Sequence, residues 1–135
     1  MYQVSYERSY YYPTTEDDIT LQAELRLAQE GVEAEAKLDT GAAFCLFKRS
    51  YAEELGLVVE QGYRQRFGTL TDSFTAYGYM LVLKTLEIEL EVMVFFPADI
   101  FIPRNLLGRN WLRKVRLGLV DYEGLLYLSK YQQEE

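Results

Sequence analysis

The sequence predicts an all-β domain with two short helices. Over residues 20–38 and again over residues 86–94, apolar and polar side chains alternate with a period of two, which is typical of strands with one buried face. Residues 63–96 are rich in aromatic and β-branched side chains, which favour strands. Only two short stretches, near residues 50–56 and 109–115, have the capping pattern or the spacing of a helix.

A single folded domain accounts for the length and composition. A chain of 135 residues can bury one hydrophobic core, and its content of 49% hydrophobic residues argues against disorder. The sequence has no internal repeat and no linker-like segment that would indicate a second domain. We therefore predict an N-terminal arm over residues 1–19, a domain over residues 20–130 and a short tail over residues 131–135.

The charge balance argues against several classes of partner. With 14 Lys and Arg against 21 Asp and Glu, the net charge is −7, and no basic cluster indicates a nucleic-acid partner. No apolar stretch approaches the roughly 20 residues that a membrane-spanning helix needs, so we expect no membrane partner. One cysteine cannot form an internal disulfide, and the first residues lack a signal-peptide pattern. We therefore expect a cytoplasmic protein.

Histidine is absent from the sequence, which restricts the possible chemistry. Its absence excludes nucleophiles that depend on a Ser/His or Cys/His pair. A zinc site would have to be built almost entirely from carboxylates, although zinc prefers nitrogen and sulfur ligands. We therefore expect neither a metal site nor another cofactor.

The N-terminal part is predicted to form a hairpin that leads to an acidic turn. Residues 1–18 hold five tyrosines without periodicity, so they form either a loosely attached arm or an arm that pairs with a sheet edge or a partner chain. Residues 20–27 and 32–38 alternate as two antiparallel strands around a turn at residues 29–31. The second strand delivers the chain to Asp39, at the tip of a tight turn.

A short helix is predicted after this turn. Gly41 tolerates backbone conformations that are closed to other residues, which lets the chain double back beside Asp39. Ser50 and Glu53 have the spacing of a capping box, and Gly56 suits the position just after a helix. We therefore predict a helix of about two turns that serves as a structural connector.

The central segment is predicted to form two β-hairpins or a meander of three to four strands. Residues 63–67 and 74–77 flank the polar segment 68–73, which would be the turn of a projecting hairpin. A later strand shows one face to the core and one to water. Its apolar face comprises Leu86, Ile88, Leu90, Val92 and Val94.

The C-terminal segment is predicted to hold a second helix and a last hairpin. Residues 97–104 contain two prolines and cannot continue a central strand. A helix is predicted over residues 109–115, where Trp111, Leu112 and Val115 have helical spacing. Residues 116–120 and 125–128 flank a four-residue connection that ends in glycine, which indicates a hairpin.

Two short motifs carry a resemblance to a known family. Asp39-Thr40-Gly41, followed by Ala42, ends a predicted strand, and Leu106-Leu107-Gly108 precedes a short predicted helix. On these segments the chain resembles the retropepsin-like aspartic proteases, the single-domain relatives of pepsin, over about residues 20–128. The resemblance implies an all-β, closed or folded β-sheet domain similar to one half of pepsin, with two short helices, which acts as a homodimer.

The resemblance also implies roles for individual residues. Asp39 falls on the catalytic aspartate of the family, Thr40 on a residue whose hydroxyl bonds across the dimer axis, and Gly41 on a glycine that approaches substrate. Ala42 continues this loop, and the apolar pair and glycine at 106–108 pack against it. The hairpin that closes over substrate, the flap, corresponds to residues 67–76. Its substrate-binding tip would comprise Gly68, Thr69, Leu70, Thr71, Asp72 and Ser73.

The chemistry of amide hydrolysis agrees with this assignment. The attacking water must lose a proton to a base, and the leaving nitrogen must gain one from an acid. Two carboxylates that share one proton fill both roles, whereas one carboxylate cannot. Because the chain offers one Asp-Thr-Gly, two copies of Asp39 must meet across a two-fold axis. We therefore predict a homodimeric aspartic endopeptidase that acts on peptide or protein substrates through an activated water.

The chain departs from the viral members of the family at three places. Ala43 and Phe44 stand where retroviral enzymes usually have acidic residues, Cys45 stands where Ser or Thr is common, and the tip of the flap lacks a glycine-rich segment. The two lost acids remove anchors for the substrate backbone and a partner for Arg109. Two other functions remain open. One is a non-catalytic member that binds peptides or dimerises. The other, for which the aromatic content of 15% is the only argument, is a small closed β-barrel that binds an apolar ligand.

Structural roles are the alternative for several of the residues singled out above. Asp39 and Asp72 could serve as turn carboxylates, and Cys45 is expected to be a small buried residue. Trp111 is expected in the core. We expect the two arginines around the Leu-Leu-Gly segment, Arg104 and Arg109, to form structural ion pairs.

Overall fold

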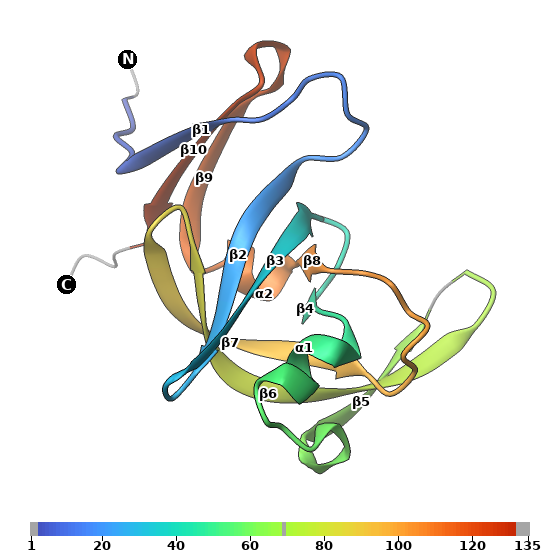
Figure 1. Cartoon of the computed structure of the whole chain (residues 1–135). Coiled ribbons are helices and arrows are strands. Elements are labelled where there is room, and N and C mark those ends of the chain that lie inside the picture. Colours follow the sequence, from blue (N-terminus) through green and yellow to red (C-terminus); the bar gives the residue numbers. More distant parts are fainter. Residues whose placement is uncertain (1–2, 69, 132–135) are drawn as a thin grey trace.

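The computed structural model of the chain describes residues 3–68 and 70–131 (Figure 1). Most of the described residues lie in two β-sheets. The larger sheet has the order β2-β3-β8-β4-β7-β6-β5, and a further pairing of β2 with β6 closes it into a barrel. Its strands are β2 (Thr20–Leu27), β3 (Glu30–Leu38), β4 (Cys45–Leu46), β5 (Tyr63–Gly68), β6 (Ser73–Thr85), β7 (Ile88–Pro97) and β8 (Leu106–Leu107).

The smaller sheet and four helical segments complete the fold. The sheet has the order β1-β10-β9, formed by β1 (Arg8–Tyr11), β9 (Val115–Val120) and β10 (Leu125–Lys130). The helices are α1 (Arg49–Glu54) and α2 (Arg109–Leu112), with 3-10 turns η1 (Val59–Gln61) and η2 (Asp121–Glu123). The predicted all-β class with two short helices is confirmed. None of the helices in the described part of the chain is long and apolar enough to cross a membrane.

The first hairpin forms as its alternation predicts, but its turn lies earlier than predicted. Leu21, Leu25 and Ala36 of β2 and β3 are buried on one face. The strands join through a two-residue turn at Ala28 and Gln29, and Glu30 already pairs with the last residue of β2. Ala28 has φ of 54°. A two-residue turn matches the twist of paired strands, which explains why the prediction of a turn at residues 29–31 was wrong.

The central segment is an antiparallel meander of β5, β6 and β7, one of the two predicted alternatives. Leu86 is not part of the strand in which it was predicted. It forms the two-residue turn between β6 and β7 with Glu87, and both residues have positive φ, 49° and 65°. Pro97 ends β7, so the strand stops where proline removes a backbone donor.

Both helices exist, with different ends than predicted. Lys48 is the residue before α1 and no side chain caps the helix, so the capping box at Ser50 was wrong. Gly56 does end the helix: it has φ of 80° and donates to the carbonyl of Glu53, as in a Schellman motif. The second helix, α2, stops before Val115. That β-branched residue begins β9 and pairs with β10.

The N-terminal arm pairs with a sheet edge, which was one of its two predicted arrangements. β1 runs antiparallel to β10, with Arg8 opposite Leu128. Tyr12 is buried, its N–H donates to the carbonyl of Gly124 (2.8 Å) and its hydroxyl donates to Asp121 (2.5 Å). This hydrogen bond raises the pKa of Tyr12 to about 12.

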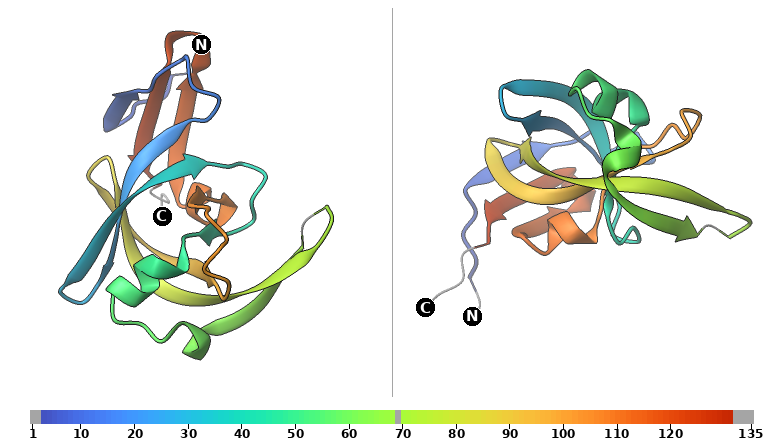
Figure 2. Two further views of the ribbon diagram at one scale, coloured as in Figure 1. Left: turned by 45° about the vertical axis from the view of Figure 1, so that its right-hand side comes forward. Right: turned by 90° about the horizontal axis from the view of Figure 1, so that it is seen from below.

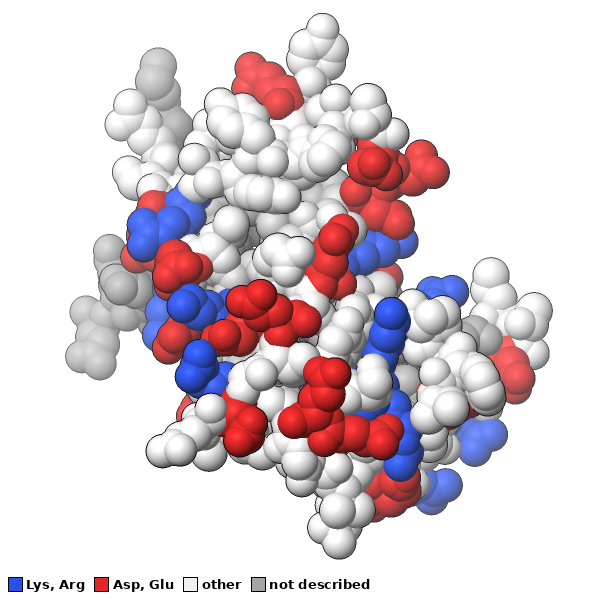
Figure 3. All heavy atoms as spheres, viewed as in Figure 1, with Lys and Arg blue, Asp and Glu red and all other residues white. Residues whose placement is uncertain are grey.

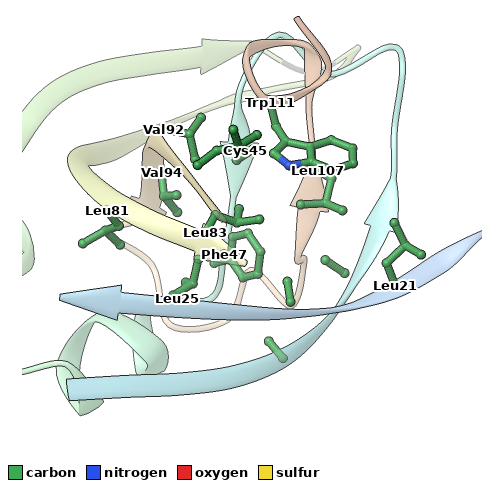
Figure 4. Packing of buried hydrophobic residues seen from close by; sticks show 14 of the residues in the cluster. Leu21, Leu25, Cys45, Phe47, Leu81, Leu83, Val92, Val94, Leu107 and Trp111 are labelled. Carbon is green, nitrogen blue, oxygen red and sulfur yellow. The ribbon is translucent and has the colours of Figure 1, made fainter. Parts of the chain in front are cut away.

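The main core fills the barrel and reaches α2. Trp111 lies among apolar side chains from β2, β4, β6, β7 and β8 (Figure 4). A second, smaller cluster of Leu46, Ala76 and Phe95 lies apart from it, with Phe44 and Phe67 packed against its surface. The second cluster is the one that contacts the candidate site.

Candidate active site

Asp39 directly follows β3, and backbone hydrogen bonds hold the chain at that point. Leu38 N–H donates to the carbonyl of Ile19 (2.8 Å), and Asp39 N–H donates to the carbonyl of Leu107 (3.0 Å). β3 also pairs in parallel with β8, which places Leu38 opposite Leu107. The backbone is therefore fixed on both sides where the carboxylate leaves the strand.

The Asp39 carboxylate makes one hydrogen bond within its own loop. Its Oδ1 accepts from Gly41 N–H at 2.9 Å, as in an Asx-type turn. Asp39 is half-buried, whereas Thr40 and Gly41 are exposed. Within the described part of the chain, no donor contacts the second oxygen, Oδ2. The role of a turn carboxylate therefore accounts for only one of the two oxygens.

The segment that contains Gly108 fastens the loop after Asp39. A Cβ at Gly108 would lie 2.4 Å from the carbonyl oxygen of Phe44 and 2.9 Å from that of Ala42. Arg109 N–H donates to the carbonyl of Ala42 (2.7 Å), and Asn110 N–H donates to that of Ala43 (3.1 Å). Only glycine fits at this contact, because backbone atoms occupy the space that a side chain would need.

Two asparagines join the segment just after this loop to the barrel, and sequence reasoning gave neither of them a role. The Asn110 side chain accepts from Cys45 N–H (2.9 Å) and donates to the carbonyl of Met93 (2.7 Å). The Asn105 side chain accepts from Lys48 N–H (3.0 Å) and donates to a carbonyl of β3 (3.1 Å). The sequence signal that could have identified them is an asparagine on each side of a short apolar segment, because an amide side chain can both donate and accept a hydrogen bond.

A cleft of about 600 Å³ opens beside the loop. It lies between the loop, the β5–β6 hairpin that projects from the barrel and the segment that leads into β8 (Figure 2). Asp39 itself does not line the cleft, but Gly41, which bonds to its carboxylate, does. The other lining residues are Ala42, Ala43, Phe44, Leu46, Gln65, Arg66, Phe67, Gly68, Phe74, Phe101, Ile102, Pro103, Arg104 and Leu106.

The predicted substrate-binding tip of the hairpin contributes little to the cleft. Gly68 lines it, whereas Thr69 lies outside the described residues. Leu70, Thr71 and Asp72 are exposed, Ser73 is half-buried, and none of these four lines the cleft. Ser73 N–H donates to the carboxylate of Asp72 (2.8 Å), which is a turn contact. The hairpin reaches the cleft instead through the strands below its tip.

An aromatic cluster joins the loop to the hairpin. The ring of Phe44 meets the edge of Phe67 at 5.9 Å between centroids and that of Phe95 at 5.0 Å. Phe67 also stacks on Phe74 at 5.4 Å. Phe44, Phe67 and Phe74 are half-buried, so part of each ring is exposed. Sequence reasoning missed this cluster because its members come from separate elements and have no common period.

Two arginines near the site lack the ion pairs that were predicted for them. Neither Arg104 nor Arg109 makes an ion pair with a carboxylate in the described ranges 3–68 and 70–131. For Arg109, the reason lies in its immediate surroundings. Gly108 brings Arg109 against Ala42 and Ala43, which offer carbonyl groups but no carboxylate.

Cys45 and Trp111 have the structural roles that were predicted for them. Both residues are fully buried. Burial raises the pKa of the Cys45 thiol to about 11, so the reactive thiolate is disfavoured. The indole Nε1 of Trp111 has no hydrogen-bond acceptor among the described residues. Trp111 thus contributes to the site only through packing beneath the loop.

Comparison with known proteins identifies a family. The family model described as aspartyl protease matches residues 23–111, from β2 to α2. The match includes both the loop at Asp39 and the segment around Gly108 that fastens it. A search of curated proteins found no match. Since the family match spans more than half of the chain, the resemblance noted in the sequence is confirmed, and the chain belongs to the aspartyl protease family.

Proposed function

We propose that the protein is an aspartic endopeptidase in which Asp39 from two subunits activates a water molecule. The observation that carries the proposal is the position of Asp39. Its backbone is fixed to Leu107, its Oδ1 is oriented by Gly41, and its loop borders a cleft of about 600 Å³. A catalytic group needs such a fixed backbone next to space for substrate.

Hydrolysis requires two carboxylates with different protonation states. Two carboxylates a few ångströms apart resist double ionisation and share one proton. The ionised member takes a proton from water, while the protonated member donates to the carbonyl oxygen of the substrate and later to the leaving nitrogen. We expect activity to decline on both sides of an optimum, because one added or removed proton destroys this arrangement.

A homodimer supplies the second carboxylate in this proposal. The chain contains one Asp-Thr-Gly, so an isologous contact across a two-fold axis is the simplest way to bring two copies of Asp39 together. Thr40 and Gly41 are exposed in the single chain, which leaves this part of the loop accessible to a partner subunit. The exposed Thr40 hydroxyl is then available to bond across the axis.

The N-terminal arm does not block the cleft in the described chain. No residue of the segment 3–19 lines it, and β1 instead pairs with β10 in the smaller sheet. A plugged cleft would have favoured a non-catalytic module. The open cleft favours the peptidase.

Asp39→Asn tests the proposal against the non-catalytic alternative. We expect cleavage of a denatured protein substrate to fall by at least about a thousandfold, because the amide cannot act as a base. Asp17→Asn makes the same change at an exposed residue outside the cleft and should leave activity unchanged. Equal cleavage by wild type and Asp39→Asn would refute the assignment.

Mixing the two proteins tests whether the dyad spans two subunits. When Asp39→Asn is added to an equal amount of wild type and the subunits exchange freely, activity per wild-type chain should fall to about one half. The reason is that half of the wild-type chains then sit in mixed dimers with a single Asp39. Unchanged activity per wild-type chain, with subunit exchange verified by mass, would show that each subunit works alone.

A further inference from the structure

We propose that the cleft selects peptides that carry a carboxylate side chain next to a bulky apolar side chain. The inference rests on the proposed peptidase function and specifies its substrate class. Two features of the cleft carry it: an aromatic wall and two arginines without carboxylate partners. Apart from Phe44, which ends the loop after Asp39, the residues of both features lie on β5, β6 and the segment before β8.

The aromatic wall suits a bulky apolar side chain. Phe44, Phe67 and Phe74 are half-buried and line the cleft, and Ile102 adds an aliphatic surface on the other side. The rings support one another, since Phe67 packs edge to face on Phe44 and stacks on Phe74. An apolar side chain placed here would cover surface that is exposed in the free protein, which favours its binding.

The charge of the cleft is opposite to that of the whole chain. The net charge is −7, yet the described residues that line the cleft include Arg66 and Arg104 and no Asp or Glu. Figure 3 shows acidic side chains over the middle of one face of the molecule, and Lys and Arg side chains both on the side of the projecting hairpin and on the opposite edge. A local cationic site attracts an acidic ligand group.

The two guanidinium groups are available to a ligand. Arg66 donates through Nε to the hydroxyl of Ser73 (3.0 Å), which orients the group and leaves its terminal nitrogens unbonded within the described chain. Arg104 has no ion pair with any described carboxylate. A guanidinium group binds a carboxylate through two parallel hydrogen bonds. Arg66 and Arg104 enter from β5 and from the segment before β8, so they approach the cleft from two of its walls.

The loop after Asp39 adds no charged side chain to the cleft. It contributes Gly41, Ala42, Ala43 and Phe44 to the lining, and all four are uncharged. An acidic substrate side chain therefore meets a methyl group and an aromatic ring on the loop side, and arginines on the other sides.

Matched peptides test the inference. One set places Phe next to Glu, and two control sets replace this Glu with Gln or Lys, with the pair moved through every position of the peptide. We expect KM for the Glu set to be about fivefold lower than for the Gln set, the usual size of a partly exposed charge pair, with similar kcat. Arg66→Gln combined with Arg104→Gln should remove this preference. Arg113→Gln, an equal charge change at an exposed residue outside the cleft, should retain it.

Binding to Asp39→Asn separates this inference from the peptidase proposal. Fluorescence anisotropy of labelled Glu, Gln and Lys peptides reports affinity without cleavage. Tighter binding of the Glu peptide supports the inference even if wild type cleaves nothing, in which case the peptidase proposal fails alone. Equal affinity for all three peptides, or a Glu preference that survives the double arginine variant, overturns the inference even if wild type is an active peptidase.

Discussion

The two walls of the cleft are built in different ways. On one side, the loop from Asp39 to Phe44 is fastened by backbone bonds to Leu107, Arg109 and Asn110. The Asn110 side chain also accepts from Cys45 N–H, directly after the loop, and donates to the carbonyl of Met93 on β7. On the other side, the β5–β6 hairpin extends beyond the barrel. Its strands pair up to Gly68 and Ser73, and its side-chain bonds near the tip are exposed, such as the cross-strand bond from Arg66 to Ser73. The aromatic cluster joins the two walls.

The two walls suit different tasks in the proposed enzyme. The fastened loop suits the positioning of Asp39, and the exposed hairpin suits contact with the substrate. A catalytic carboxylate must be held within a fraction of an ångström, and backbone hydrogen bonds that fix the chain beside it achieve this. A wall that meets substrates of varied shape gains from exposed bonds and fewer fixed partners, because such segments open at lower free energy. We therefore expect substitutions in the loop wall to change stability and those in the hairpin wall to change substrate binding.

The largest expected effect is that of Gly108→Ala. The new methyl group would overlap the carbonyl groups of Phe44 and Ala42, and backbone cannot move aside cheaply. We expect the free energy of unfolding, measured in urea, to fall by at least about 3 kcal/mol. Gly68→Ala, on the hairpin wall, places its methyl group where nothing lies within 4 Å and should be nearly neutral. Similar effects of the two variants would contradict the comparison.

The next largest expected effect is on the rate at which the single thiol, that of Cys45, reacts with an alkylating reagent. Burial raises the pKa of Cys45 from 9.0 to about 11, so near pH 8 it should react with iodoacetamide about a hundredfold more slowly than an accessible thiol. A Thr71→Cys, Cys45→Ala protein carries its only thiol on the exposed hairpin and should react at the rate of a free cysteine. Equal rates would show that the loop wall opens as readily as the hairpin.

The same thiol makes a pH-dependent contribution to stability. Its folded pKa lies above the unfolded value, so its contribution is present below pH 9 and is lost as the pH rises toward 11. The difference in unfolding free energy between wild type and Cys45→Ala should therefore shrink over this window. A constant difference would mean that the thiol is not desolvated.

Asn110→Ala should have a smaller effect than Gly108→Ala. The change leaves Cys45 N–H and the carbonyl of Met93 without partners in a partly buried place, which costs about 2 kcal/mol. Ser73→Ala removes the exposed bond from Arg66 and should change stability by less than about 0.5 kcal/mol. Urea unfolding of both variants measures this difference, and a larger loss at Ser73 would reverse the assignment of the two walls.

The smallest expected effect concerns the contact between the walls. A double-mutant cycle of Phe44→Leu and Phe67→Leu should give a coupling energy of about 1 kcal/mol for their edge-to-face contact. A coupling near zero would mean that the walls are independent in solution. Phe74→Leu paired with Phe44→Leu is a suitable control, since no ring contact joins these two residues directly.

The alternation of apolar and polar residues predicted most strands, because one face of each strand is buried. The turns were harder to predict, because their conformations depend on small differences in free energy. Ala28 and Leu86 adopt positive φ although neither is glycine, and the pairing of the long strands around them outweighs this local cost. Val115 has helical spacing from Trp111, yet it joins β9 because pairing with β10 buries it. Ser50 has the right spacing for a cap, but the helix already includes it.

From the sequence, the candidate site could be predicted only where its residues lie within one short segment. The Asp-Thr-Gly motif places Asp39 at a turn, since the chemistry and the turn share three adjacent residues. The cleft is assembled from three distant segments, so Phe44, Arg104 and Ile102 meet only after folding. The locking role of Asn110 is likewise a tertiary contact, because its partners lie on β4 and β7.

The pairing of β1 with β10 also determines where a label can be attached to the protein. Glu7 and Ser129 are hydrogen-bonded neighbours, so the first and last strands of the described chain lie together on one side of the molecule (Figure 1). The projecting hairpin lies on the opposite side of the same view. A label attached to an exposed residue of β1, such as Arg8, therefore lies on the side of the molecule away from the hairpin wall of the cleft.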